Sequence, residues 1–109
     1  MRVFALKSCD TCRKALAQIR AAGHDPQVID IRADGISAAD LSDILGQLGP
    51  AALNRASTTW RGLSEAEKLW DPARLLTRYP TVLKRPVIEN AGHWTAGWTA
   101  ETQSNLLKS

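Results

Sequence analysis

The feature that most restricts the fold of this chain is a pair of cysteines, Cys9 and Cys12, between a short apolar run and an amphipathic segment. The apolar run covers residues 2–6, and two polar residues interrupt it as at the end of a strand. Residues 11–22 place their apolar side chains on one helical stripe, and Gly23 supplies a stop signal. Cys9 is therefore predicted at a strand-to-helix corner.

A second strand is predicted after this helix. Residues 27–31 follow Pro26, are mostly apolar, and have the pattern of a buried strand. A strand, a helix and a second strand within 30 or so residues form a unit whose two strands pair in parallel. Residues 2–31 are expected to form such a unit.

The middle of the chain is predicted to be helical, with one irregular segment. Ser37 and Asp40 resemble a capping box, and Gly49 with Pro50 ends the helix that follows. Residues 51–63 are rich in Asn, Ser, Thr and Gly and are expected to form a functional loop. Residues 64–79 contain two helix-start signals, which predicts two short helices in series.

The last third predicts a hairpin and a final helix. Pro86 stands at the entrance of an apolar strand that includes Val87, where a proline marks a special backbone. A turn at residues 90–92 is followed by residues 93–96, which can return as an antiparallel partner. Thr99 is expected to cap a helix that continues to Leu107. One α/β domain over residues 1–109 accounts for all these elements.

Composition excludes several classes of protein. The net charge is +3, and 9 of the 14 basic residues are arginine, which suits anionic ligands. No Lys/Arg-rich run indicates nucleic-acid binding. No apolar stretch is long enough for a signal peptide or a membrane span, so a cytoplasmic protein without a membrane partner is expected. Cysteines in that reducing compartment are better explained by catalysis, redox sensing or metal binding than by a permanent disulfide, although two thiols alone do not complete a zinc site.

The position of Cys9 favours a reactive thiol. Free N–H groups and the helix dipole at a helix start both stabilise a thiolate, and Lys7, Arg13 and Lys14 add positive potential. Cys12 lies on the same helical face, where it can attack a mixed disulfide or simply pack. The alternative is that both cysteines are small apolar core residues.

Three segments carry a resemblance to a known family. Residues 7–15 (KSCDTCRKA), 53–61 (LNRASTTWR) and 84–89 (KRPVIE) are similar to segments of the arsenate reductase (ArsC) family, in the same order. Within that family, the chain resembles the YffB/Spx-type branch. The resemblance implies a thioredoxin-like fold with a mixed sheet of about four strands, and a helical insertion between its strand–helix–strand and strand–strand–helix halves.

The resemblance also implies site residues. Cys9 corresponds to the nucleophile. The expected catalytic set is Cys9 with Arg85 and with Cys12, which is included because of its spacing from Cys9 and not because of the resemblance. Arg55 and Arg85 correspond to arginines around an oxyanion pocket, and Arg13 to a basic position near the nucleophile. Pro86 corresponds to a proline that is cis in thioredoxin-like folds. These residues, apart from the cysteines, form the expected substrate-binding set.

Two departures from the family pattern decide among the implied functions. Asp10 and Cys12 stand where arsenate reductases typically have glycine and serine, and residues 92–98 lack the further arginine of the oxyanion site. We therefore expect a glutathione-dependent thiol reductase that uses the Cys9 thiolate. The alternatives are a glutathione- and glutaredoxin-dependent arsenate reductase, and an Spx-like redox-sensing regulator that binds RNA polymerase.

These functions imply few partners. Glutathione is the expected co-substrate, with a small oxyanion as the other possible ligand and glutaredoxin as a protein partner. No bound cofactor or metal is expected, and the protein is expected to be a monomer.

Overall fold

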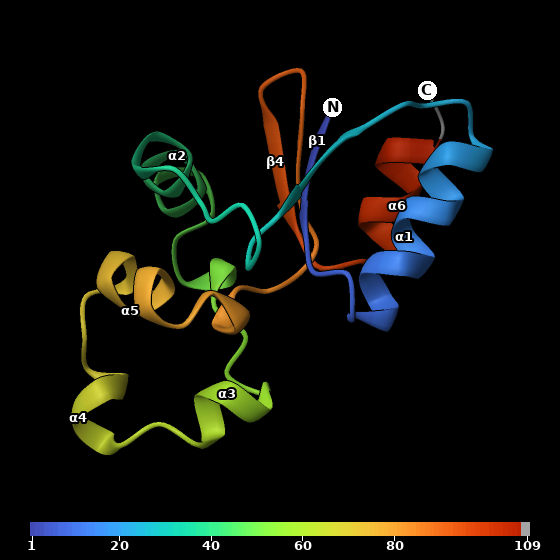
Figure 1. The fold of residues 1–109 in the computed structure, drawn as a ribbon. Coiled ribbons are helices and arrows are strands. Elements are labelled where there is room, and N and C mark those ends of the chain that lie inside the picture. Colours follow the sequence, from blue (N-terminus) through green and yellow to red (C-terminus); the bar gives the residue numbers. More distant parts are fainter. Residues whose placement is uncertain (108–109) are drawn as a thin grey trace.

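A mixed four-stranded sheet with helices on both faces forms the core of the computed structural model, which describes residues 1–107 (Figure 1). The strand order is β2-β1-β3-β4. In chain order the elements are β1 (Arg2–Ala5), α1 (Asp10–Ala21), β2 (Gln27–Asp30), α2 (Ala38–Leu48), η1 (Gly49–Ala52), α3 (Thr58–Arg61), α4 (Glu65–Lys68), α5 (Pro72–Arg78), η2 (Pro80–Val82), β3 (Val87–Asn90), β4 (His93–Ala96) and α6 (Ala100–Leu107). The predicted α/β fold with a helical insertion is confirmed.

Helix α1 follows the sequence signals closely. Its C-terminal end is a Schellman motif, in which the Gly23 N–H donates to the Arg20 carbonyl and the His24 N–H to the Ile19 carbonyl. Gly23 has a φ of 95°, a conformation that side chains with a Cβ rarely adopt. The glycine therefore ends the helix where the sequence predicted.

Strand β2 differs from the prediction in one respect. It pairs in parallel with β1, as expected, with Val3 opposite Val28. It is the edge of the sheet, however, and Val28 is 38% exposed, so the prediction of a buried strand was wrong. An apolar run does not distinguish an edge strand from a central one, because sheet order depends on pairings distant in the sequence.

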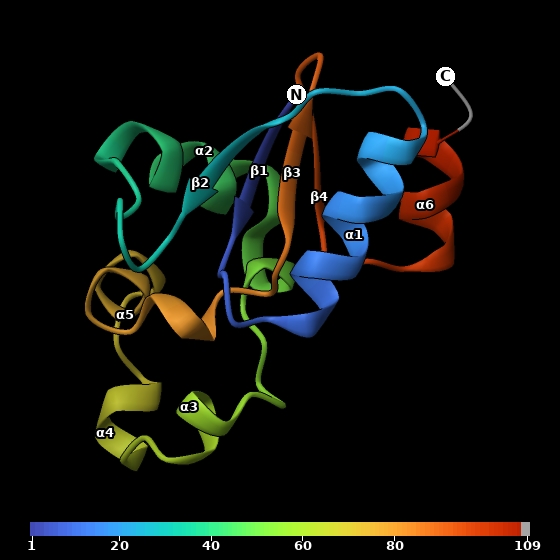
Figure 2. The same ribbon diagram turned by 45° about the vertical axis from the view of Figure 1, so that its right-hand side comes forward.

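The alternation of side chains along the strands divides the core into two layers. Val3 and Ile88 face α1 and α6, whereas Phe4 and Val87 face the layer that contains α2 and α5. Figure 2 shows α1 and α6 on one side of the sheet and α2 and α5 on the other. The sheet therefore separates two helical layers.

The helical insertion contains one more α-helix than predicted, together with the 3-10 helices η1 and η2. Ser64 and Glu67 form a complete capping box at the start of α4, and Asp71 caps α5, as the sequence indicated. Residues 51–63 were expected to be irregular, but they include the second half of η1 and all of α3, which Ser57 caps through the Trp60 N–H. A helix of four residues has too little periodicity to be recognised in a sequence.

The C-terminal half completes the sheet. Strands β3 and β4 form the predicted antiparallel hairpin, with Ala91 and Gly92 at positive φ in the turn. Thr99 accepts the Thr102 N–H at 3.1 Å and so caps α6, as predicted. Within residues 1–107, no helix is long and apolar enough to cross a membrane.

A hydrogen bond holds α4 against the segment after α5. The Tyr79 hydroxyl donates to the Glu67 carboxylate, and this bond lowers the pKa of Glu67 and raises that of Tyr79. Because the pKa of Glu67 is lowered, the hydrogen bond contributes to stability at pH values above 4.5, the ordinary pKa of a glutamate. This contribution is lost as the pH falls below that value.

We therefore expect the free energy of unfolding of the wild type to fall more steeply below that pH than the value for Tyr79→Phe. Urea denaturation over an acid pH series measures both curves. A constant difference between them, down to the lowest pH at which both proteins fold, would contradict this role for Glu67.

Candidate active site

Cys9 is the residue that precedes α1, and its backbone is extended, with φ −90° and ψ 117°. Its N–H donates to the Leu6 carbonyl at 3.0 Å, and its carbonyl accepts the Arg13 N–H at 3.0 Å. These bonds fix the strand-to-helix corner predicted from the sequence. The side chain is half-buried and makes no capping hydrogen bond. Because Cys9 precedes the first residue of the 12-residue helix α1, its thiol lies at the positive end of the helix dipole.

The Cys9 side chain lines a cavity of about 390 Å³, within the size range of small-ligand sites. The opposite wall is formed where residues 52–54 pair with residues 82–84, which are distant in the sequence. The Asn54 N–H donates to the Val82 carbonyl, and the Lys84 N–H donates to the Ala52 carbonyl, both at 2.8 Å. This pairing brings the start of α3 and the residues before β3 to the same end of the sheet as Cys9.

The cavity wall is mostly polar and carries one positive charge. The side chains with a hydroxyl or an amide are Ser8, Asn54, Ser57, Thr58, Thr59 and Thr81. The Thr59 and Thr81 hydroxyls are hydrogen-bonded at 2.7 Å, which ties α3 to the segment before Arg85. Arg85 is the cation, and none of the ten residues that line this cavity in the described chain is acidic. Such a wall suits an anionic ligand.

The peptide bond between Arg85 and Pro86 is cis, as predicted. Pro86 is fully buried, and its carbonyl accepts the N–H of Gly97, the residue that follows β4. Arg85 itself is half-buried and lies on the cavity wall with Cys9. The hairpin therefore anchors the backbone that carries the cavity's arginine.

Cys12 has a different environment from Cys9. It is 1% exposed and packs with Val3, Ile19 and Leu106 in the core between the sheet and the two helices α1 and α6. Burial raises the pKa of its thiol to about 12, with a smaller contribution in the same direction from a hydrogen bond with the Cys9 side chain. Cys12 is therefore a neutral thiol at physiological pH.

Two of the predicted substrate-binding arginines do not line the cavity. The Arg55 guanidinium lies over the Trp60 ring, 5.4 Å from its centroid. Arg13 forms an ion pair with Asp10 and lines another cavity, which contacts Cys12. The expectation that Arg55 joins Arg85 around one pocket does not match this arrangement, because the Arg55 side chain lies over Trp60 of α3.

Several cavity residues were not singled out from the sequence. Ser8, Asn54 and Thr81 have no motif of their own, although the Asn-, Ser- and Thr-rich composition of residues 51–63 already indicated a functional segment. Thr81 lines the cavity because the segment that contains it pairs with residues 52–54. Within residues 1–107, no group of three or more His, Cys, Asp or Glu side chains is placed to hold a metal ion.

The contrast between the two thiols predicts selective labelling. In the native protein, iodoacetamide should alkylate Cys9 and leave Cys12 unmodified, since only Cys9 is accessible and Cys12 remains protonated. Peptide mapping by mass spectrometry after timed alkylation measures both sites, and labelling in urea is the control that shows Cys12 can react. Equal rates at the two sites in native protein would contradict the placement of Cys12.

Comparison with known proteins gives consistent matches. The model of the ArsC family matches residues 4–106. An uncharacterized protein of Haemophilus influenzae is 33% identical over 101 residues, which cover 88% of this chain and 89% of that protein. The solved structure of a YffB protein superposes with a TM-score of 0.88 at 31% identity and covers 97% of both chains. An arsenate reductase (ArsC) related protein from Brucella melitensis gives 0.74 at 29% identity, covering 99% of this chain and 94% of that one.

Proposed function

This chain belongs to the ArsC family, and we propose that it is a thiol reductase in which the Cys9 thiolate is the nucleophile and glutathione is the reductant. The observation that carries the proposal is the shared cavity of Cys9 and Arg85. A thiol at a helix start supplies the nucleophile, and a guanidinium on the same wall can hold a carboxylate. Glutathione carries two carboxylates, one of which Arg85 can hold, and its sulfur, when it is part of a disulfide, can react with the Cys9 thiolate.

The reaction has two thiol–disulfide exchanges. The Cys9 thiolate attacks the glutathione sulfur of a mixed disulfide, a Cys9–glutathione bond forms, and the other thiolate leaves and takes a proton. The thiolate of a second glutathione then attacks the glutathione sulfur on Cys9, which releases glutathione disulfide and restores the Cys9 thiolate. Glutathione is oxidised, and the thiol of the original substrate is reduced.

Cys12 is a poor candidate for the second step. Its burial and its raised pKa keep it neutral, and a thiol attacks a disulfide only as the thiolate. An external glutathione reaches the adduct through the open cavity instead. We therefore assign Cys12 to the packing of α1, and Arg85 to binding of the glutathione carboxylate.

Arsenate is the second candidate substrate. It is favoured by the oxyanion character of the cavity and by the description of the Brucella protein as related to arsenate reductase. Residues 92–98 supply no arginine to the site, and Asp10 brings a negative charge beside Cys9. The ion pair of Asp10 with Arg13 offsets part of that charge. A single cavity arginine is better matched to one carboxylate than to a multiply charged oxyanion.

The test begins with the adduct. Reduced protein is mixed with glutathione disulfide, and peptide mapping by mass spectrometry should find glutathione on Cys9. Turnover is then measured with glutathione, glutathione reductase and NADPH, using either the cysteine–glutathione mixed disulfide or arsenate. Faster Cys9-dependent turnover of the mixed disulfide supports the proposal. Efficient Cys9-dependent arsenate reduction would favour the second candidate. Failure of both assays and of adduct formation would leave the redox-sensing regulator as the better explanation.

A further inference from the structure

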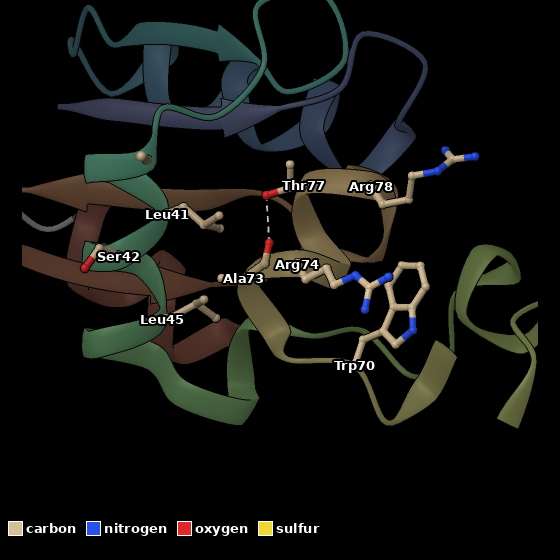
Figure 3. A pocket seen from close by; sticks show the side chains of 9 residues that line it. Leu41, Ser42, Leu45, Trp70, Ala73, Arg74, Thr77 and Arg78 are labelled. Atoms are coloured by element: carbon tan, nitrogen blue, oxygen red, sulfur yellow. Dashed lines mark hydrogen bonds between the residues drawn. The ribbon is translucent and has the colours of Figure 1, made fainter. Parts of the chain in front are cut away.

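A groove away from Cys9 lies between α2 and α5 (Figure 3). It encloses about 890 Å³, and none of the residues that line it also lines the Cys9 cavity. The sheet separates α2 and α5 from α1, the helix that carries the two cysteines. A ligand in this groove therefore has no direct contact with the reactive thiol.

The floor of the groove is apolar and has helical spacing. Helix α2 contributes residues 38, 41, 42 and 45, which share one face over two turns. Figure 3 shows Leu41 and Leu45 on this face, opposite Ala73 of α5. Leu45 and Ala73 are only half-buried, so apolar surface remains at the bottom of the groove. Two helices with an open apolar seam between them match the groove into which an amphipathic helix docks.

The edge of the groove along α5 is positively charged. Arg74 and Arg78 are four residues apart on this helix, and both are exposed. The Arg74 guanidinium is stacked on Trp70 at 3.9 Å from the ring centroid, a contact that holds the charge at the edge. No acidic side chain lines the groove in the part of the chain that is described.

Three acidic residues stand next in sequence to the groove faces: Asp40 and Asp71, which have partners, and Asp43 of α2, which is exposed. Asp40 of α2 accepts from Arg2 at 2.8 Å, and Asp71 accepts the Ala73 N–H as the cap of α5. None of these three side chains lines the groove. The groove lining itself therefore carries two positive charges and no negative charge, beside an apolar floor.

We propose that this groove binds an amphipathic helix of a protein partner, with an apolar face that fits the seam and acidic residues on the side facing α5. Charge complementarity selects this occupant, because a basic helix would be repelled by Arg74 and Arg78, whereas an acidic one would be attracted. The proposal does not depend on the proposed reductase activity, because the groove and the Cys9 cavity are separate.

The test selects ligands without presupposing the partner. A displayed library of helix-forming 15-residue peptides is panned on the immobilised, reduced, full-length protein, and the enriched peptides are synthesised with a fluorescent label. We expect them to carry apolar residues at positions i, i+3 or i+4, and i+7, flanked by Asp or Glu. Affinity is then measured by fluorescence anisotropy for wild type and for variants.

Three variants locate the binding site. Arg74→Gln with Arg78→Gln should weaken the enriched peptides about tenfold and reduce the salt dependence of binding. Ser42→Trp, which fills the groove from an exposed position on α2, should abolish binding. Arg20→Gln is the matched control on α1 and should change the affinity less than about twofold. Circular dichroism and the protection of Cys12 from iodoacetamide confirm that each variant is folded.

The proposal is overturned if panning enriches no peptide, if the enriched peptides show no acidic bias, or if Ser42→Trp binds them as wild type does. Peptides that compete with glutathione disulfide for the Cys9 cavity, and lose binding in Arg85→Ala but not in the groove variants, would place the interaction at the active site instead.

Discussion

Replacement of Cys9 by serine is expected to lower kcat/KM for a glutathione mixed disulfide at least about a thousandfold, because serine forms no disulfide and the exchange then has no carrier. Cys12→Ala, by contrast, should retain activity within about threefold, since the buried, neutral Cys12 thiol takes no part in the exchange with external glutathione. The coupled assay with glutathione reductase and NADPH measures both variants.

The pair of variants is matched, because each removes one sulfur from the same helix start. Cys12→Ala leaves a small cavity in the core and should cost about 1 kcal/mol of stability, which urea denaturation measures separately from activity. An adduct should still form on Cys9 in this variant. A loss of activity in Cys12→Ala as large as that in Cys9→Ser, in protein that remains folded, would show that Cys12 resolves the adduct and that the mechanism uses two protein thiols.

The contrast between the two cysteines depends on tertiary packing, which explains why the sequence left the role of Cys12 open. Residues three apart on a helix share a face, so the spacing alone permits both a resolving and a packing role. In the structure α6 and β3 cover that face and place Leu106 and Ile88 in the same core cluster as Cys12, which favours the packing role. Both residues come from the far end of the chain.

Features with local causes were predicted well. The glycine stop after α1, the capping box of Ser64 and Glu67, and the hairpin turn after Asn90 each depend on a few adjacent residues. The cis bond before Pro86 was predicted from family resemblance rather than from local chemistry. These signals were sufficient to predict the position of most helices and strands along the chain.

The composition of the site was less predictable, because it depends on side-chain direction. Arg55 and Arg85 both stand in segments that meet beside Cys9, yet only Arg85 lines the cavity, while Arg55 is stacked on Trp60. Thr81 lines the cavity because its segment pairs with the residues before α3. Sequence motifs and the spacing of hydrophobic residues do not predict this kind of pairing between distant segments.

Because Arg85 lines the cavity and Arg55 does not, substitution of Arg85 is expected to lower activity strongly. Arg85→Ala should lower kcat/KM for the glutathione mixed disulfide about tenfold to a hundredfold, since a hydrogen bond to a charged group contributes about 1.5–3 kcal/mol and each 1.4 kcal/mol corresponds to about tenfold. The loss should appear mainly in KM, because the carboxylate is held equally before and during the exchange. Arg85→Lys should recover part of it, as it keeps the charge without the planar fork of donors.

Arg55→Ala is the matched control for this experiment, because it removes the same side chain from a neighbouring segment. The Arg55 guanidinium is exposed and interacts with Trp60 outside the cavity, so the variant should change kcat/KM less than about threefold. The family resemblance predicts a loss for Arg55 as well as for Arg85, whereas the cavity geometry predicts a large loss for Arg85 only. Steady-state kinetics of the two variants therefore separate the two descriptions of the site: equal losses would mean that Arg55 leaves Trp60 to bind substrate, and a normal KM in Arg85→Ala would remove Arg85 from the glutathione site.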